Sequence, residues 1–215
     1  MNDEQQRTFE LADVEIRMVD GQAPVIAGYA VVFDSWSETM IDGRGRAFRE
    51  RFAPGAFDRT LAGNPDIRAL WSHDQGKPLG RTRNGTLRVR KDGAGLRFEL
   101  DAPPTSWGAD AVVSIRRGDV TNMSFAFLAR GDGRDTWERG GADGVALRTV
   151  LDADLLEVSP VAFPAYPATS VAVRAVSVPD GLESDGQEAG EIARQAGQQA
   201  LRLRVQVERE LMNWE

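Results

Sequence analysis

The sequence contains no cysteine among its 215 residues. This excludes disulfide bonds, thiolate nucleophiles and the common cysteine-based zinc sites, and we expect an intracellular protein. Histidine occurs once, at His73, so a metal site would need a set of carboxylate ligands. We therefore expect neither a metal nor a cofactor. Lysine occurs only at Lys77 and Lys91, which leaves few candidates for a serine–lysine catalytic pair.

Long hydrophobic runs are also missing. No stretch approaches the roughly 18 apolar residues that a membrane-spanning helix needs. The first ten residues are polar and acidic, which is not the pattern of a secretory signal. The net charge is −7, which argues against a protein that binds nucleic acid by neutralising phosphates. We accordingly expect no membrane and no nucleic-acid partner.

What the sequence does contain is a series of short segments that predict strands. Several, such as 14–18 and 96–101, have apolar residues at every second position, the pattern of half-buried strands, while 25–33 is mostly apolar, the pattern of a strand buried on both faces. Two segments predict helices instead, and Thr105 or Ser106 could cap the second, with Gly118 at its end. We expect strands over 14–18, 25–33, 67–73, 86–90, 96–101, 121–128, 145–151 and 154–163, helices over 54–63 and 109–117, and loops over 34–53 and 131–144. The fold class is therefore mainly β with short helices (α+β).

The composition changes after residue 178. Residues 179–190 are polar with several glycines and predict a linker. Residues 191–215 place apolar side chains three or four positions apart, which predicts an amphipathic helix. That helix could pack on the domain or serve as a handle for a partner or for self-association. The predicted organisation is a β-rich domain over 1–178, a linker and a C-terminal helix.

Ser124 is the first candidate for chemistry. In the strand over 121–128, the small residues Asn122, Ser124 and Ala126 share one face, while bulky residues share the other. A serine between small neighbours leaves room for a peptide backbone beside its hydroxyl. Ser124 could equally be a small residue on a strand with no catalytic role. The sequence contains no G-x-S-x-G motif, so an α/β-hydrolase is not indicated.

A serine nucleophile needs a base, and the base needs a group that orients it. His73 ends a predicted strand on the face shared by Trp71, and it could be the base or a packed histidine. Glu157 lies in an apolar strand, where a carboxylate needs a partner such as an imidazole N–H or an arginine. Asp152 and Asp154 are fallback candidates for the orienting acid. Adjacent strand residues face opposite sides, which disfavours Asp74.

Several segments, taken in order, resemble the tailed-phage prohead (procapsid maturation) serine protease family. The resemblance covers about residues 25–175 and rests on the combination of segments. The matching segments are 28–33 (GYAVVF), 52–57 (FAPGAF), 70–74 (LWSHD) with 79–81 (LGR), 118–127 (GDVTNMSFAF), and 156–161 (LEVSPV) with 164–167 (PAYP).

The resemblance implies a herpesvirus-assemblin-like fold, a closed β-barrel ringed by helices. It also implies a serine endopeptidase that cleaves the scaffolding segment of the major capsid protein, and often itself, during phage head maturation. Its partners would be that capsid protein and its scaffolding segment, inside the assembling prohead in the host cytoplasm. Ser124 matches the family nucleophile, His73 the general base, and Glu157 an acidic position that we assign as the orienting group.

Two other functions stay open at this point. The chain could be a non-catalytic capsid-assembly scaffold module, which would tolerate Ser124→Ala. It could also be a hydrolase that uses paired carboxylates such as Glu157 and Asp154, which would survive Ser124→Ala but not Glu157→Gln. For the protease, backbone N–H groups must form the oxyanion hole, and the sequence does not place them; the loop after Phe127, around residues 130–131, is one candidate.

Overall fold

The computed structural model describes residues 5–10, 12–18, 21, 23–129, 133–140, 144–162 and 176–182. These residues form two compact units. The first contains the described residues up to 35, together with 51–136 and 149–162; the second contains 36–50, 137–148 and 176–182. The predicted C-terminal helix over 191–215 and most of the predicted linker lie outside the described residues.

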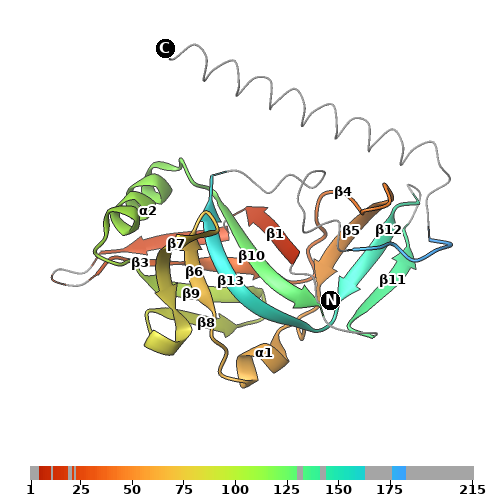
Figure 1. Ribbon diagram of the computed structural model, residues 1–215, viewed down its shortest axis with the longest axis horizontal. Coiled ribbons are helices and arrows are strands. Elements are labelled where there is room, and N and C mark those ends of the chain that lie inside the picture. The colour runs from red at the N-terminus through yellow and green to blue at the C-terminus, as the bar shows by residue number, and fades with distance from the viewer. Residues whose placement is uncertain are drawn as a thin grey trace, which may run out of the picture. The chain divides into compact units, whose positions relative to one another are not determined.

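The first sheet belongs to the first unit and has five strands in the order β1-β10-β13-β6-β7 (Figure 1). Neighbouring strands are antiparallel, except that β13 and β6 run parallel. The strands are β1 (Gln5–Glu10), β6 (Arg68–Trp71), β7 (Asp74–Arg81), β10 (Asn122–Ala129) and β13 (Ala153–Val161). The strand predicted through His73 thus ends at Trp71, and a further strand, β7, begins at Asp74.

The second sheet also lies in the first unit, with four antiparallel strands in the order β2-β3-β9-β8. Its strands are β2 (Ala12–Arg17), β3 (Val25–Val32), β8 (Leu87–Lys91) and β9 (Gly95–Asp101). The strands predicted over 86–90 and 96–101 are confirmed as β8 and β9, which pair with each other as an antiparallel hairpin.

The core of the first unit is built from both sheets. On β10, Met123, Phe125 and Phe127 are completely buried in this core, and they alternate with the residues of the opposite face. The rings of Phe125 and Phe127 meet those of Phe52 and Phe57, with ring centroids 5.1–6.1 Å apart. Aromatic burial of this kind is the main stabilising contribution to such a core. It fixes β10 rigidly from one side.

Two α-helices occur in the described part of the chain. They are α1 (Asp58–Ala62) and α2 (Ser106–Arg117), and a short 3₁₀ helix, η1 (Thr82–Asn84), follows β7. The Thr105 side chain accepts a hydrogen bond from the Gly108 N–H, and Gly118 ends the helix at a φ of 78°. The predicted cap and end of α2 are therefore confirmed.

The second unit contains the third sheet, in the order β11-β12-β5-β4. Its strands are β4 (Met40–Ile41), β5 (Ala47–Phe52), β11 (Asp135–Arg139) and β12 (Ala146–Val150), of which the ends of β5, β11 and β12 belong to the first unit. The interpretation of 34–53 and 131–144 as loops is thus wrong. Glu50 on β5 is 1% exposed and forms a buried ion pair with Arg148 at 2.6 Å, so a charged residue occupies a core position.

The predicted closed barrel ringed by helices is also wrong. A barrel needs its outermost strands to pair with each other. The outer strands of the first sheet are β1 and β7, those of the second are β2 and β8, and neither pair is joined.

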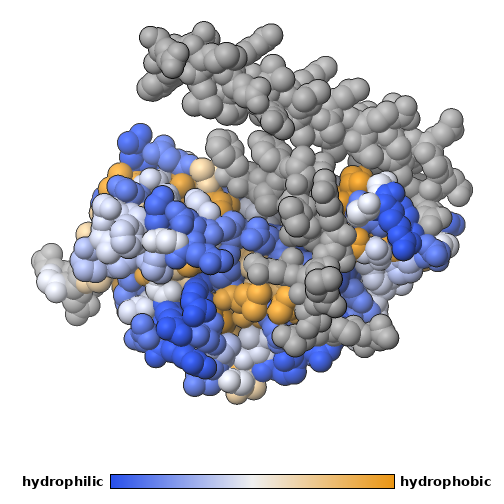
Figure 2. All heavy atoms as spheres, viewed as in Figure 1, coloured by the Kyte–Doolittle hydropathy of each residue, from blue (hydrophilic) through white to orange (hydrophobic). Residues whose placement is uncertain are grey.

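The described residues contain no helix long and apolar enough to cross a bilayer. Figure 2 shows a largely hydrophilic described surface on this face, with hydrophobic side chains gathered over β13 near α1.

Candidate active site

Three side chains from distant parts of the chain meet on the first sheet. The Nε2 atom of His73 lies 2.7 Å from the Oγ atom of Ser124, which is 51 residues away in sequence. The Nδ1 atom of the same ring is hydrogen-bonded to Oε1 of Glu157, 84 residues away. The structure therefore brings together all three residues that the sequence singled out. A serine, a histidine and a carboxylate in this order can perform nucleophilic chemistry.

The alternation of β10 positions Ser124. Because Met123 and Phe125 point into the core, Ser124 between them points to the opposite face of the first sheet. Its cross-strand neighbour on β13 is Ser159, another small residue. Ser124 is completely buried, and β1 pairs with the other edge of β10.

A β-bulge in β13 positions Glu157. Ala126 pairs with Glu157, but the next residue of β10, Phe127, pairs with Leu155, so Leu156 is an extra residue. Leu155 is 3% exposed and belongs to the core. Strict alternation would send Glu157 into the core beside it, whereas the extra residue turns Glu157 to the face of Ser124. The sequence carries no visible mark of this bulge.

His73 occupies the turn between β6 and β7. Trp71 pairs with Asp74, which leaves Ser72 and His73 as a two-residue loop. Both have positive φ values, 53° for Ser72 and 60° for His73. A type I′ hairpin turn requires positive φ at both positions, and residues other than glycine rarely adopt it. The Ser72 N–H donates to the Pro160 carbonyl at 3.2 Å and fastens the turn to β13.

His73 therefore reaches the site from a strained turn, not from a strand. The prediction that it shares a strand face with Trp71 is wrong, because strand geometry stops at Trp71. Strained backbone of this kind is concentrated at functional sites, where the surrounding structure holds it in place. Sequence periodicity could not reveal it, since the turn contains neither glycine nor asparagine.

The other carboxylates near the site are engaged elsewhere. Asp74 accepts hydrogen bonds from the Gly76 N–H at 2.8 Å and from Lys77, and these hold its pKa below the usual value. Asp152 and Asp154, the fallback candidates, both pair with Arg59. Of the predicted acids, the structure brings Glu157 alone to His73.

The carboxylate of Glu157 is largely shielded from water, with 12% of its side chain exposed against 23% for His73. The Ser159 hydroxyl lies at hydrogen-bond distance, 3.5 Å from Oε1. A carboxylate in this position fixes the imidazole orientation and favours the tautomer with its proton on Nδ1. The Nε2 atom is then free to accept the Ser124 proton.

A hollow of about 880 Å³ opens beside Glu157. Its walls combine apolar side chains such as Leu70 and Leu156 with the charged side chains of Arg68 and Arg81. It is large enough for one or more side chains of a bound peptide. The predicted oxyanion residues 130–131 lie outside the described residues, so their contribution stays a prediction.

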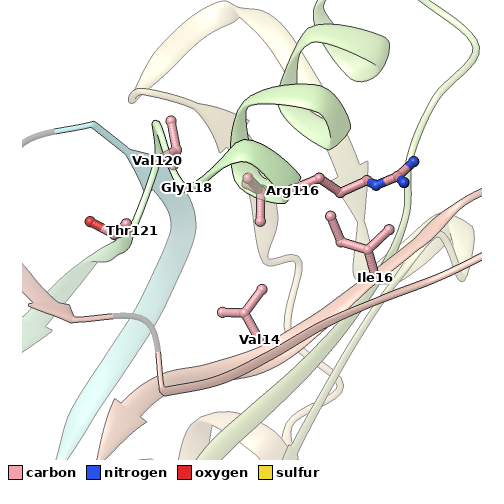
Figure 3. Close-up of a pocket in the computed structure, with 7 residues that line it drawn as sticks. Val14, Ile16, Arg116, Gly118, Val120 and Thr121 are labelled. Carbon is pink, nitrogen blue, oxygen red and sulfur yellow. The ribbon is translucent and has the colours of Figure 1, made fainter.

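A second hollow lies between β2 and the end of α2 (Figure 3). Val14 and Ile16 face it from β2, with Val120 opposite, and Arg116 is the charged residue at its wall. None of Ser124, His73 or Glu157 lines it. The described residues also contain no cluster of three or more histidine or acidic side chains that could hold a metal ion.

Comparison with known proteins gives a family match and a likeness to solved structures. Residues 12–183 match the sequence model of the caudovirus prohead serine protease family. The chain is similar to the bacteriophage T4 capsid assembly protease, gp21, with 12% identity and a TM-score of 0.46 over 74% of this chain and 99% of that chain. No curated protein matches the sequence.

Proposed function

Because this chain belongs to the caudovirus prohead serine protease family, we propose that Ser124 is its nucleophile, His73 its general base and Glu157 the residue that orients the base. Family membership makes the chain a peptide-bond hydrolase of phage capsid assembly. The assignment of these three residues is supported above all by one observation, the continuous hydrogen-bonded path from Glu157 through His73 to Ser124.

In the proposed mechanism, the Oγ atom of Ser124 attacks the carbonyl carbon of a peptide bond while Nε2 of His73 takes the hydroxyl proton. Glu157 stabilises the imidazolium that forms. His73 then delivers this proton to the leaving amine, which departs and leaves an acyl group on Ser124. A water molecule, deprotonated by the same imidazole, hydrolyses this ester and restores the serine.

We propose that the substrate is the scaffolding segment of the major capsid protein, and in addition a second copy of this chain. Cleavage would take place inside the assembling prohead in the host cytoplasm. The hollow beside Glu157, which neither Ser124 nor His73 lines, supports a peptide substrate only as a place for a side chain, because its walls are both apolar and charged.

The test is the intact mass of the capsid protein after co-expression with the full chain, as wild type and as Ser124→Ala. We expect trimmed capsid protein with the wild type and full-length capsid protein with the variant. A fluorophosphonate probe, which reacts with activated serines, should label the wild type and not Ser124→Ala. Capsid protein that is untrimmed with both, yet assembles normally, would favour the scaffold module instead.

We also propose the domain organisation predicted from the sequence: a protease domain over 1–178, a linker over 179–190 and a helix over 191–215 that mediates self-association. Within the described part, Val178 and Leu182 pack on the third sheet, and the Val178 N–H donates to Asp42 at 2.9 Å. Limited proteolysis should cut first after Leu182, and a cut within 145–161 would argue against this division.

A further inference from the structure

The strand β1 lies directly beside the strand that carries Ser124. All six residues of β1 pair antiparallel with β10, and Thr8 stands opposite Ser124. The other side of β10 is fully paired with β13. The β1 side is therefore the edge of β10 from which an extended peptide could approach Ser124.

The hydroxyl of Ser124 is engaged by β1 as well as by His73. Its Oγ atom lies 3.0 Å from the carbonyl oxygen of Arg7, to which it can donate a hydrogen bond. A hydroxyl has a single proton, so the Arg7 carbonyl competes with His73 Nε2 for the proton that the reaction must transfer. Ser124 is also completely buried in this state.

The Arg7 side chain holds β1 down at this point. It is 4% exposed, and its guanidinium lies over the ring of Phe127 at 5.4 Å from the centroid. It also donates to the Gln6 carbonyl at 2.8 Å and to Gln5 Oε1 at 3.2 Å. The carbonyl that faces Ser124 thus belongs to a residue whose side chain is buried against Phe127 of β10, while its two hydrogen bonds lie within β1.

We propose that β1 occupies the binding position of the substrate, and that a substrate segment binds as an extended strand antiparallel to β10 after β1 has left it. This inference rests on the proposed function, because it gives Ser124 its role as nucleophile. It assigns the edge of β10 that β1 now occupies as a peptide-binding surface. The occupant is an extended polypeptide segment that forms main-chain hydrogen bonds with β10.

Exchange of one strand for another is energetically feasible. An incoming segment replaces the main-chain hydrogen bonds of β1 one for one, so the net cost is set by side-chain differences and by ordering of the new segment. Main-chain pairing is also tolerant of sequence. One edge can therefore accept different segments, including one from a second copy of this chain.

A reversible tether tests the proposal in the full chain. Gln6 and Ala126 stand directly opposite each other on β1 and β10, within the Cα separation that a disulfide bridges. Because the chain has no cysteine, the variant Gln6→Cys/Ala126→Cys can form only this bond within one molecule. The readouts are the rate of fluorophosphonate labelling of Ser124 and the trimming of co-incubated capsid protein.

We expect the oxidised variant to label and trim about tenfold more slowly or worse than the same protein after reduction, because the competent state is no longer populated. The reduced form controls for the substitutions themselves. A matched control is Arg90→Cys/Arg97→Cys, which links opposite residues of β8 and β9 away from the site. Its rates should not depend on oxidation.

Equal rates before and after reduction of the Gln6–Ala126 tether would overturn the proposal and leave the proposed function intact. If instead wild type and Ser124→Ala behave alike in both readouts, the proposed function fails and the proposal falls with it.

A second variant tests the proposal even if the protein with two cysteines does not fold. Thr8→Pro weakens the pairing of β1, and it should label severalfold faster than wild type; slower labelling would contradict the proposal.

Discussion

At the scale of single residues, the site depends on a carboxylate that is nearly enclosed by protein. Glu157 meets the imidazole of His73 and the hydroxyl of Ser159, and little of its side chain reaches water. An ionised group in such a position interacts strongly with a developing imidazolium, since the surrounding dielectric is low. The negative charge of Glu157, more than its hydrogen bond alone, therefore stabilises the imidazolium that forms during the reaction.

We predict that Glu157→Gln keeps the fold and lowers kcat by about a thousandfold or more, as removal of the charge from other triads does. The measurement is steady-state cleavage of the capsid protein, with a thermal melt to show that the variant is folded. Asp154→Asn is the matched control, because Asp154 pairs with Arg59 and not with His73. Equal losses in the two variants would contradict the assignment of Glu157.

The strained turn gives a second prediction at this scale. Ser72 has a φ of 53°, a conformation that costs a residue with a side chain about 1–2 kcal/mol and costs glycine far less. We expect Ser72→Gly to raise the free energy of unfolding by about 0.5–1 kcal/mol after the extra chain entropy of glycine is subtracted. Urea unfolding measures this change. Ser72→Ala keeps the strain and should give no gain.

At the scale of elements, β5 shows how a buried charge can hide a strand. Its sequence, Ala47–Phe52, contains three charged residues and predicts a loop. Glu50 is nevertheless buried, because Arg148 of β12 neutralises it and the Arg148 guanidinium lies over the ring of Trp137. The strand depends on a pairing between positions 98 residues apart, which no local pattern contains.

We predict that Glu50→Ala lowers the free energy of unfolding by about 3–5 kcal/mol, since it leaves the buried guanidinium of Arg148 without this carboxylate. Replacing both partners, as Glu50→Leu/Arg148→Met, should lower it much less, because no charge then remains at these two positions. Denaturant titrations of the two variants compare these values. If the double variant is as unstable as the single one, packing and not charge is the cause.

At the scale of the whole molecule, acid stability follows from a carboxylate that ties two strands together. Asp66 precedes β6, and Arg81 ends β7. Side-chain hydrogen bonds from Arg81 lower the pKa of Asp66 from 3.8 to about 2, against an opposing effect of desolvation. A pKa that is lower in the folded state stabilises the fold above the unfolded value, and this contribution disappears as the pH falls.

We therefore predict that the part of the stability due to Asp66 is fully present above about pH 4 and is lost between about pH 4 and pH 2. Asp66→Asn should be less stable than wild type at pH 6 and should converge with it near pH 2. Urea midpoints from pH 2 to pH 6 measure this. A constant difference between the two proteins across that range would show that the ionised carboxylate is not the cause.

Much of the fold could be predicted from the sequence. The predictions that failed did so for physical reasons that the structure shows. Alternation predicts β9 and β10, apolar segments predict β3 and β13, and a capping threonine with a terminal glycine predicts the ends of α2. Ser124, His73 and Glu157 are candidates from their segments and from the family resemblance, and the structure brings their side chains together. The closed barrel, the loop over 34–53 and the strand through His73 were wrong. Whether a barrel closes depends on which strand edges pair. The strand within 34–53 depends on the buried ion pair of Glu50, and the end of β6 depends on the left-handed turn at Ser72 and His73. Long-range contacts set all three, so local sequence patterns do not contain them.

The position of β1 has a consequence for when the enzyme works. A strand joined covalently to its own sheet competes with free peptides at an effective concentration in the millimolar range. A dilute peptide loses this competition, whereas chains packed together at comparable concentration can win it. On this proposal, local concentration controls the start of hydrolysis. Cleavage begins once the protease and its substrates are confined in one small volume, and encounters at lower concentration do not lead to cleavage.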